Sequence, residues 1–267
     1  MVFRASVQYV LEKPLFLMGC NILLGLVVPI AARLAGNNDP YDNQISHVFG
    51  QGSICVAMDF PGWMEAATTM FFFTGLLHSY GMIKIYQHCK REWEGENSKK
   101  FLLAFVAFEI FCVNCFWLVG LFSPVLDHSI DTVYAHSIPY VALQMCFFFW
   151  VIFLIAFVRP TGVGKIRAVS WYCFSGGYLA LQIFVLVLIF WTFAELSQPG
   201  VAMAGADRYK GPMARGASWI PLSEPLGLLC RLGCFFLHPL RLAAPQQEPE
   251  AKKPEPTKVE AFEAQEP

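Results

Sequence analysis

Residues 137 to 158 read SIPYVALQMCFFFWVIFLIAFV and contain no charged side chain. A helix crosses the hydrocarbon core of a bilayer with about 20 mostly apolar residues, so this stretch is long enough to do so. Backbone groups in lipid need hydrogen-bond partners within the segment, which favours a helix. A β-barrel strand would instead alternate in polarity over about 10 residues. The stretch therefore indicates an integral membrane protein.

Four further stretches have the same character, and polar loops separate them. We therefore predict an all-α, polytopic transmembrane helix bundle in residues 1–244. The expected spans are Pro14–Ala35, Ala66–Tyr86, Phe101–Ser123, Ser137–Val158 and Ser170–Phe193.

The composition of the whole chain agrees with this class. Of 267 residues, 56% are hydrophobic and 15% are charged, whereas a soluble domain carries about 25% charged residues. An ordinary soluble enzyme is therefore disfavoured. The formal net charge of −1 gives no support to a nucleic-acid partner. The partners that we expect are membrane lipids.

Basic residues predict the orientation, because Lys and Arg prefer the cytoplasmic side of a membrane. The first loop, 36–65, and the third loop, 124–136, contain none, and Arg33 lies at the edge of the first. We therefore place the N-terminus in the cytoplasm. The ten basic residues on that side are Arg4, Lys13, Lys84, Lys90, Arg91, Lys99, Lys100, Arg159, Lys165 and Arg167.

The segment Ser218–Leu242 has two interpretations. Its second half is apolar, but Pro, Glu, Arg and His interrupt it. On a helix, Arg231 and His238 would share a face, which suits an amphipathic helix at the membrane interface. The alternative is a poor sixth span that needs protein neighbours. The choice decides on which side of the membrane the tail lies.

The tail, 245–267, contains six Glu, three Lys and five Pro. Such a composition buries too little apolar surface to fold alone, which predicts a disordered segment. A protein partner that docks on this acidic, Pro-rich tail is the alternative.

Polar side chains within the spans are costly in lipid and therefore informative. At 1.5 Å per residue, they fall into two layers at different depths. They serve either as hydrogen-bonding contacts between helices or as the lining of a polar cavity. A carboxyl at the depth of Glu109 should be uncharged or paired, and His78 at matching depth is the expected partner. The inner layer contains Asn21, His78 and Glu109, and the second contains Asn114, Gln144 and Gln182.

The loops that face outward carry carboxylates and imidazoles. The third loop and the start of the next span contain Asp127, His128, Asp131 and His136. Such residues could bind a metal or perform acid–base chemistry, although polar residues belong in such a loop anyway. We treat these four as candidate metal ligands only, and expect no cofactor.

Two motifs resemble the Frag1/DRAM/Sfk1 superfamily of six-span membrane proteins. Asp39-Pro40-Tyr41-Asp42-Asn43-Gln44-Ile45-Ser46 is similar to its Pro-Tyr-Ile-Ser-Asp loop, and Leu118-Val119-Gly120-Leu121-Phe122 to its Val-Gly-Asn-Phe. His136 matches the histidine that opens span four of that family. The resemblance implies a role in lipid-linked processes without a defined catalytic chemistry. It marks Pro40, Tyr41, Gly120 and His136 as residues to test.

Three functions follow as hypotheses. The first is a non-enzymatic organiser or trafficking factor, with its polar residues packed between helices. The second is a small transporter or lipid-handling protein, with a polar cavity lined by residues such as Glu109 and Gln144. The third is a metal-dependent lipid hydrolase that uses the Asp and His residues of the outer loops. The sequence favours the first.

Overall fold

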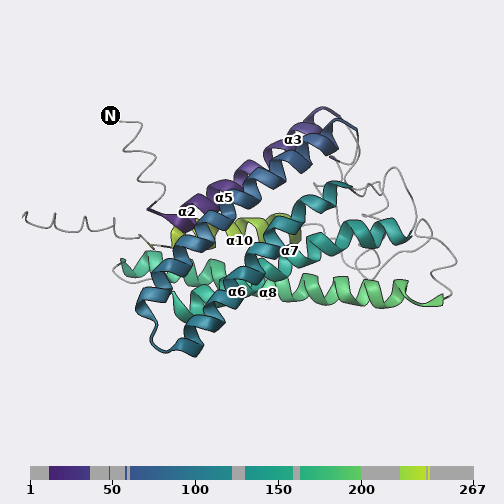
Figure 1. Ribbon diagram of the computed structural model, residues 1–267. Helices are drawn as coiled ribbons and strands as arrows, with labels where there is room; N and C mark the ends of the chain where they lie inside the picture. Colours follow the sequence, from purple (N-terminus) through teal and green to yellow (C-terminus); the bar gives the residue numbers. More distant parts are fainter. Residues whose placement is uncertain are drawn as a thin grey trace, which may run out of the picture.

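The computed structural model describes residues 12–36, 48, 58, 61–121, 130–158, 163–199, 223–238 and 240. Within these ranges the chain is helical and contains no strand, which confirms the all-α prediction. The helices lie side by side in one elongated bundle (Figure 1). They are α2 Pro14–Gly25, α3 Val27–Leu34, α5 Trp63–Glu92, α6 Glu96–Cys115, the 3-10 helix η2 Phe116–Leu121, α7 Ile130–Phe157, α8 Lys165–Leu196 and α10 Ser223–Leu237.

Four helical segments of the described chain are long and apolar enough to cross a membrane. Four of the five expected spans correspond to them. The fifth, Ala66–Tyr86, lies within α5, a helix of 30 residues. α5 falls outside the set of four because the Thr, Gly, His, Ser and Tyr residues in its middle part lower its mean hydropathy. The four segments are Pro14–Leu34, Glu96–Leu118, Asp131–Phe157 and Lys165–Leu196.

The first span is divided between α2 and α3. Pro14 occupies the first turn of α2, where its missing N–H costs no hydrogen bond. Pro29 lies four residues after Gly25, the last residue of α2. A proline inside a helix removes one backbone bond and crowds the carbonyl four residues earlier, which accounts for the interruption at Leu26.

A tight turn joins α5 to α6. The amide of Trp93 donates to the carbonyl of Cys89 as α5 ends. Gly95 then adopts φ +86°, a conformation that favours glycine, immediately before α6 begins at Glu96. At the other end of α5, the Glu65 carboxylate accepts a hydrogen bond from the Gly62 amide. α5 and α6 therefore form an antiparallel pair.

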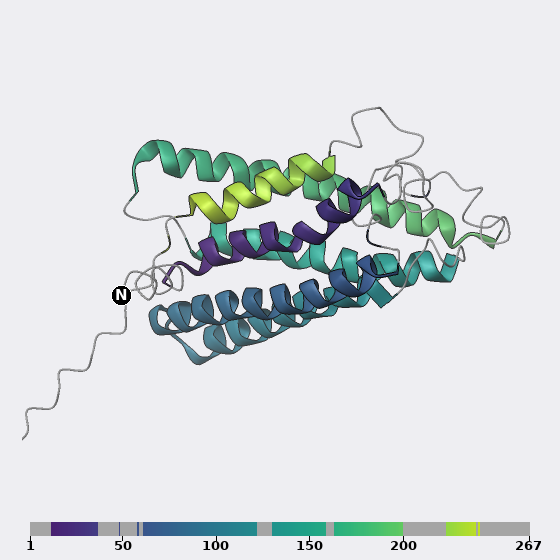
Figure 2. The same cartoon turned by 90° about the horizontal axis from the view of Figure 1, so that it is seen from above.

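α10 lies inside the bundle, between α2 and α8 (Figure 2). Its contacts with α8 run in opposite sequence directions. Arg167 contacts Leu237, Trp171 contacts Cys234, and Gly177 faces Cys230. α10 is therefore antiparallel to α8. Its last residue lies at the end of the bundle where α8 begins.

Hydrogen bonds fix the last turn of α10. The indole of Trp171 donates to the Cys234 carbonyl at 2.9 Å, and Nε of Arg167 donates to the Leu237 carbonyl at 2.9 Å. These carbonyls have no partner within the helix, and a cation near a helix C-terminus is favourable. His238 follows the helix and does not share a face with Arg231 as expected. Its Nε2 donates to the Val158 carbonyl at 2.6 Å, while its Nδ1 accepts from the Leu240 amide.

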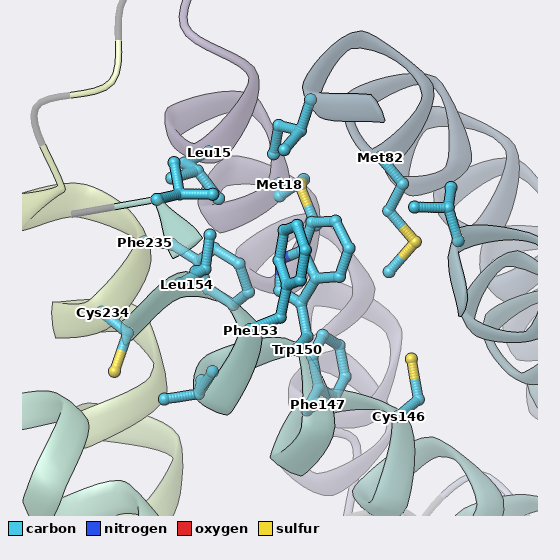
Figure 3. Close-up of a cluster of buried hydrophobic side chains, with 14 of the residues drawn as sticks. Leu15, Met18, Met82, Cys146, Phe147, Trp150, Phe153, Leu154, Cys234 and Phe235 are labelled. Atoms are coloured by element: carbon cyan, nitrogen blue, oxygen red, sulfur yellow. The ribbon is translucent and has the colours of Figure 1, made fainter. Parts of the chain in front are cut away.

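Close contacts at glycine bring α2, α5 and α10 together. A Cβ atom at Gly19 would lie 2.9 Å from the Phe236 ring, and one at Gly81 would lie 2.7 Å from Met18. Absence of a side chain lets the helices approach this closely. The buried core that results is drawn in Figure 3, whose labelled residues come from α2, α5, α7 and α10. Its labelled members are Leu15, Met18, Met82, Cys146, Phe147, Trp150, Phe153, Leu154, Cys234 and Phe235.

Large apolar side chains also cover the outside of the bundle. Phe111 of α6 exposes 66% of its surface, Val187 of α8 57%, and Leu229 of α10 56%. Soluble proteins expose apolar residues singly and seldom over every helix. Apolar residues therefore occur on both the inner and outer faces of the helices. Several polar side chains, among them Asn21, Glu109 and Gln144, are buried in the interior.

Candidate functional site

Two amide side chains of the interior join neighbouring helices. Nδ2 of Asn21 on α2 donates to the Thr74 carbonyl on α5 at 2.9 Å. Nδ2 of Asn114 on α6 donates to Oγ of Ser79 on α5 at 2.7 Å. Both are inter-helix hydrogen bonds of the kind that stabilise membrane bundles by about 0.6–2 kcal/mol. The described structure thus gives Asn21 and Asn114 packing roles.

The two expected polar layers are not separate in the structure. Asn114 was expected in the second layer and His78 in the inner one, yet Asn114 bonds to Ser79, the residue next to His78. Helices that start at different heights explain this difference. α5 continues to Glu92, and Pro14, the first residue of α2, lies level with Gly81. A membrane depth that is counted from the end of each span therefore assigns neighbouring residues of different helices to different depths.

The most elaborate polar arrangement surrounds Arg231 of α10. Its Nη2 donates to Oε1 of Gln144 on α7 at 2.9 Å. Its guanidinium carbon lies 4.4 Å from the ring centroid of Phe147 and 5.5 Å from that of Tyr178. Cations over aromatic faces within about 6 Å are attracted to the ring. α7, α8 and α10 therefore meet around one cation, and we call these four residues the Arg231 cluster.

Glu109 of α6 is the second ionisable group of the interior. Its side chain is fully buried, and neither carboxyl oxygen has a hydrogen-bond partner among the described residues. The Cys146 thiol of α7 donates to the Glu109 backbone carbonyl at 3.6 Å. Glu109 thus lies at the contact between α6 and α7, beside the Cys146 thiol.

His78 of α5 does not bond to Glu109 as expected. Its ring lies edge-on to Phe147, with centroids 5.3 Å apart, and to Phe235, with centroids 6.0 Å apart. Its Nε2 is buried and has no hydrogen bond within the described chain. Because Phe147 also holds Arg231, His78 lies beside the Arg231 cluster rather than beside a carboxylate.

Gln182 of α8 is buried close to the same cluster. It comes four residues after Tyr178, so the two side chains share one face of the helix. Its Nε2 is without a hydrogen bond in the part of the chain that the structure describes, as is the Tyr178 hydroxyl. The helix face at Ser175, Tyr178 and Gln182 therefore presents polar groups to the interior.

The candidate residues of the outer end are described only in part. His136 is buried on α7, and Asp131 lies in the first turn of that helix. The described residues hold no group of three or more His, Cys, Asp or Glu that could bind a metal ion. Gly120 lies in η2. Pro40, Tyr41, Asp127 and His128 lie outside the described residues.

Sequence reasoning assigned Arg231 to a membrane interface and did not connect it with Gln144. A signal was present, because Gln144 is the one amide in an uncharged apolar run and Arg231 is a cation between two apolar turns. Pairing them needs the antiparallel packing of α10 inside the bundle. That packing depends on tertiary contacts and not on a local pattern.

No protein-family model, curated protein or solved structure matches this chain. The resemblance to the Frag1/DRAM/Sfk1 superfamily therefore stays a prediction, and function has to be argued from the residues themselves.

Proposed function

We propose that this chain is a multi-pass membrane protein with six membrane-embedded segments, and that it acts without catalysis of its own as an organiser or trafficking factor in a lipid-linked process. One observation carries the membrane location: exposed Phe, Leu, Ile or Val side chains lie on each of the α-helices α2, α3, α5, α6, α7, α8 and α10. The hydrocarbon of a bilayer is the environment that such an outer surface fits.

The six segments comprise the four apolar ones, α5 and α10. α5 packs between α2 and α6, and two of its residues bond to these neighbours. α10 lies against α2 and α8 and has 15 residues, so it extends about 22 Å. This is shorter than the hydrocarbon core of about 30 Å. α10 is thus a short embedded segment that depends on its protein neighbours.

The proposed orientation has the N-terminus in the cytoplasm. The basic residues at the junction of α5 and α6 and at the start of α8 lie at one end of the bundle, and α2 starts there too. By the preference of Lys and Arg for the cytoplasmic side, this is the inner end. Because α10 ends there as well, the acidic tail is cytoplasmic and available to a protein partner.

Support for an organising role comes from the way interior polar groups are used. Asn21, Asn114 and Gln144 all form hydrogen bonds between helices. Such bonds stabilise the packing of membrane helices. A lipid-handling function is the second candidate. It is favoured by the Arg231 cluster, where a cation and several buried donors lie between three helices.

Two experiments test the proposal. After alkaline carbonate treatment of native membranes, the full-length chain should remain in the membrane pellet; release into the supernatant would overturn the membrane location. The chain should then be reconstituted into vesicles that contain a fluorescent lipid. An organiser leaves the rate of lipid movement between leaflets as it is in protein-free vesicles, whereas faster movement would replace the first candidate with the second.

A further inference from the structure

Arg231 places a permanent charge deep in the bundle. Its partner Gln144 lies 13 residues before Phe157, the last residue of α7. α7 has 28 residues and extends about 42 Å, so Gln144 lies at the midpoint of the helix, and the guanidinium lies near the middle of a hydrocarbon core about 30 Å thick. An ionised side chain at that depth is costly, and such residues generally have a partner and a function.

No carboxylate neutralises Arg231 within the described residues. Carboxylates of the described residues pair elsewhere: Glu92 lies 3.4 Å from His88 and Glu96 lies 3.9 Å from Lys99, at the end of α5 and the start of α6. Both carboxyl oxygens of Glu109 are without a hydrogen-bond partner in the same ranges. Gln144 and the two aromatic rings attract the cation but carry no net charge. The charge of Arg231 thus remains without a counter-ion in this part of the chain.

The polar groups around Arg231 are mostly donors that lack acceptors. Nε of Arg231 is buried without a hydrogen bond in the described structure, as are the Tyr178 hydroxyl and Nε2 of Gln182. A guanidinium N–H and an amide N–H₂ can only donate, and a hydroxyl can donate to an anion. Nε2 of His78, beside Phe147, is a further donor in one of its tautomers. Several donors around one cation are complementary to an oxyanion.

We propose that Arg231 binds the oxyanion headgroup of an anionic lipid, a phosphate or a carboxylate, between α7, α8 and α10. Tyr178 and Gln182 supply further donors from α8. The ligand reaches Arg231 from the lipid, since the Arg231 side chain is only half-buried. This inference rests on the proposed membrane location and names the lipid class that the protein recognises.

Binding of a lipid phosphate can be measured with the full-length chain purified in detergent and stripped of lipid. The probes are phosphatidic acid and a diacylglycerol with the same acyl chains, which differ only in the phosphate. Lipid adducts are counted by native mass spectrometry. We expect phosphatidic acid to bind about 10-fold more tightly than diacylglycerol, as one charge-assisted hydrogen-bonded contact would give. Equal binding of the two lipids would overturn the proposal.

Substitution of Arg231 tests the location of the site. Arg231→Met should bind phosphatidic acid about 10-fold more weakly than the wild type. Lys165→Met is the matched control, because it removes an exposed cation at the start of α8 and should bind like the wild type. The proposal fails if Arg231→Met binds unchanged or if Lys165→Met loses as much.

A second variant keeps the proposal testable should Arg231→Met fail to fold. Tyr178→Phe preserves the ring and removes only the buried hydroxyl, and it should weaken binding of phosphatidic acid about 2- to 10-fold. Unchanged binding would remove Tyr178 from the site and contradict the donor arrangement.

Inorganic phosphate distinguishes a lipid from a free anion. We expect it to leave the thermal unfolding midpoint unchanged at concentrations where phosphatidic acid raises it. If inorganic phosphate raises the midpoint in the wild type but not in Arg231→Met, the oxyanion site stands and the lipid assignment is wrong. The carbonate extraction above fails only if the membrane location is wrong, so the two proposals can fail separately.

Discussion

Two regions of the same bundle treat an ionisable side chain in opposite ways. Around Arg231, an amide and two aromatic rings from α7 and α8 converge on the charge. Around Glu109, between α6 and α7, the carboxyl oxygens have no partner in the described residues. The chemistry of the two groups explains the contrast. A carboxyl can lose its charge by binding a proton, whereas a guanidinium stays charged in proteins and has to be stabilised.

The contrast implies that the stability of the protein depends on the partners of Arg231 far more than on those of Glu109. Four predictions follow from it. Each uses the purified full-length chain in detergent, with the thermal unfolding midpoint as the measurement.

Separation of α10 from α8 should have the largest effect. A Cβ atom at Gly233 would lie 2.4 Å from Cγ of Phe174. Gly233→Leu should therefore lower stability by about 3 kcal/mol or more, through overpacking. Gly227→Leu on the same helix is the control, because nothing lies within 4 Å of a Cβ there. Equal midpoints for the two variants would mean that α10 does not pack on α8 as described.

Loss of the amide beside Arg231 should have the next largest effect. Gln144→Leu leaves the guanidinium without its 2.9 Å hydrogen bond. We expect a loss of about 2 kcal/mol, since an unsatisfied charged donor is costly. Combined with Arg231→Met, Gln144→Leu should cost less, because the donor that needs the amide has been removed. Strictly additive effects of the two substitutions would show that the residues are not coupled.

Loss of a single bond at the end of α10 should have a smaller effect. Trp171→Phe removes the indole N–H that donates to Cys234 and should cost about 1 kcal/mol. Trp191→Phe is the control, because Trp191 lies on the same helix and is 54% exposed. A loss as large in Trp191→Phe would attribute the effect to tryptophan size rather than to the hydrogen bond.

Substitution of Glu109, the buried carboxyl between α6 and α7, should have the smallest effect on stability. Glu109→Gln keeps the shape of the side chain and breaks no hydrogen bond seen in the described structure. We expect a change below about 0.5 kcal/mol. A loss as large as that of Gln144→Leu would contradict the contrast between the two regions, because it would require a strong partner for the Glu109 carboxyl.

The sequence predicted the helix class and four of the spans because long apolar runs are a local signal. Ser137–Val158 lies almost entirely within α7, and Ser170–Phe193 lies within α8. Helix ends were less well predicted. Ala66–Tyr86 is only the middle part of α5, since polar residues such as Gln87, His88 and Lys90 follow Tyr86, although the helix continues through them.

Of the Arg231 cluster, the sequence singled out only Gln144 as an inward polar residue. His78, Glu109, Asn114, Gln144 and Gln182 were expected among the inward polar groups, and all five lie on helices of the bundle. Their partners could not be predicted, because α5 extends beyond the start of α2 and depth arithmetic then misaligns the helices. Arg231 was placed at an interface, since a short segment that contains Pro and Arg is not distinguished by composition from an amphipathic surface helix.

The side on which the acidic tail lies tests the central claim most directly. α10 ends beside the beginning of α8 and the beginning of α2, so the tail and the N-terminus should lie on the same side of the membrane. An epitope at the end of the tail and another at the N-terminus can be probed with protease in sealed vesicles. We predict that both epitopes are cleaved or protected together. Cleavage of one and protection of the other would contradict the placement of α10 as an embedded sixth segment.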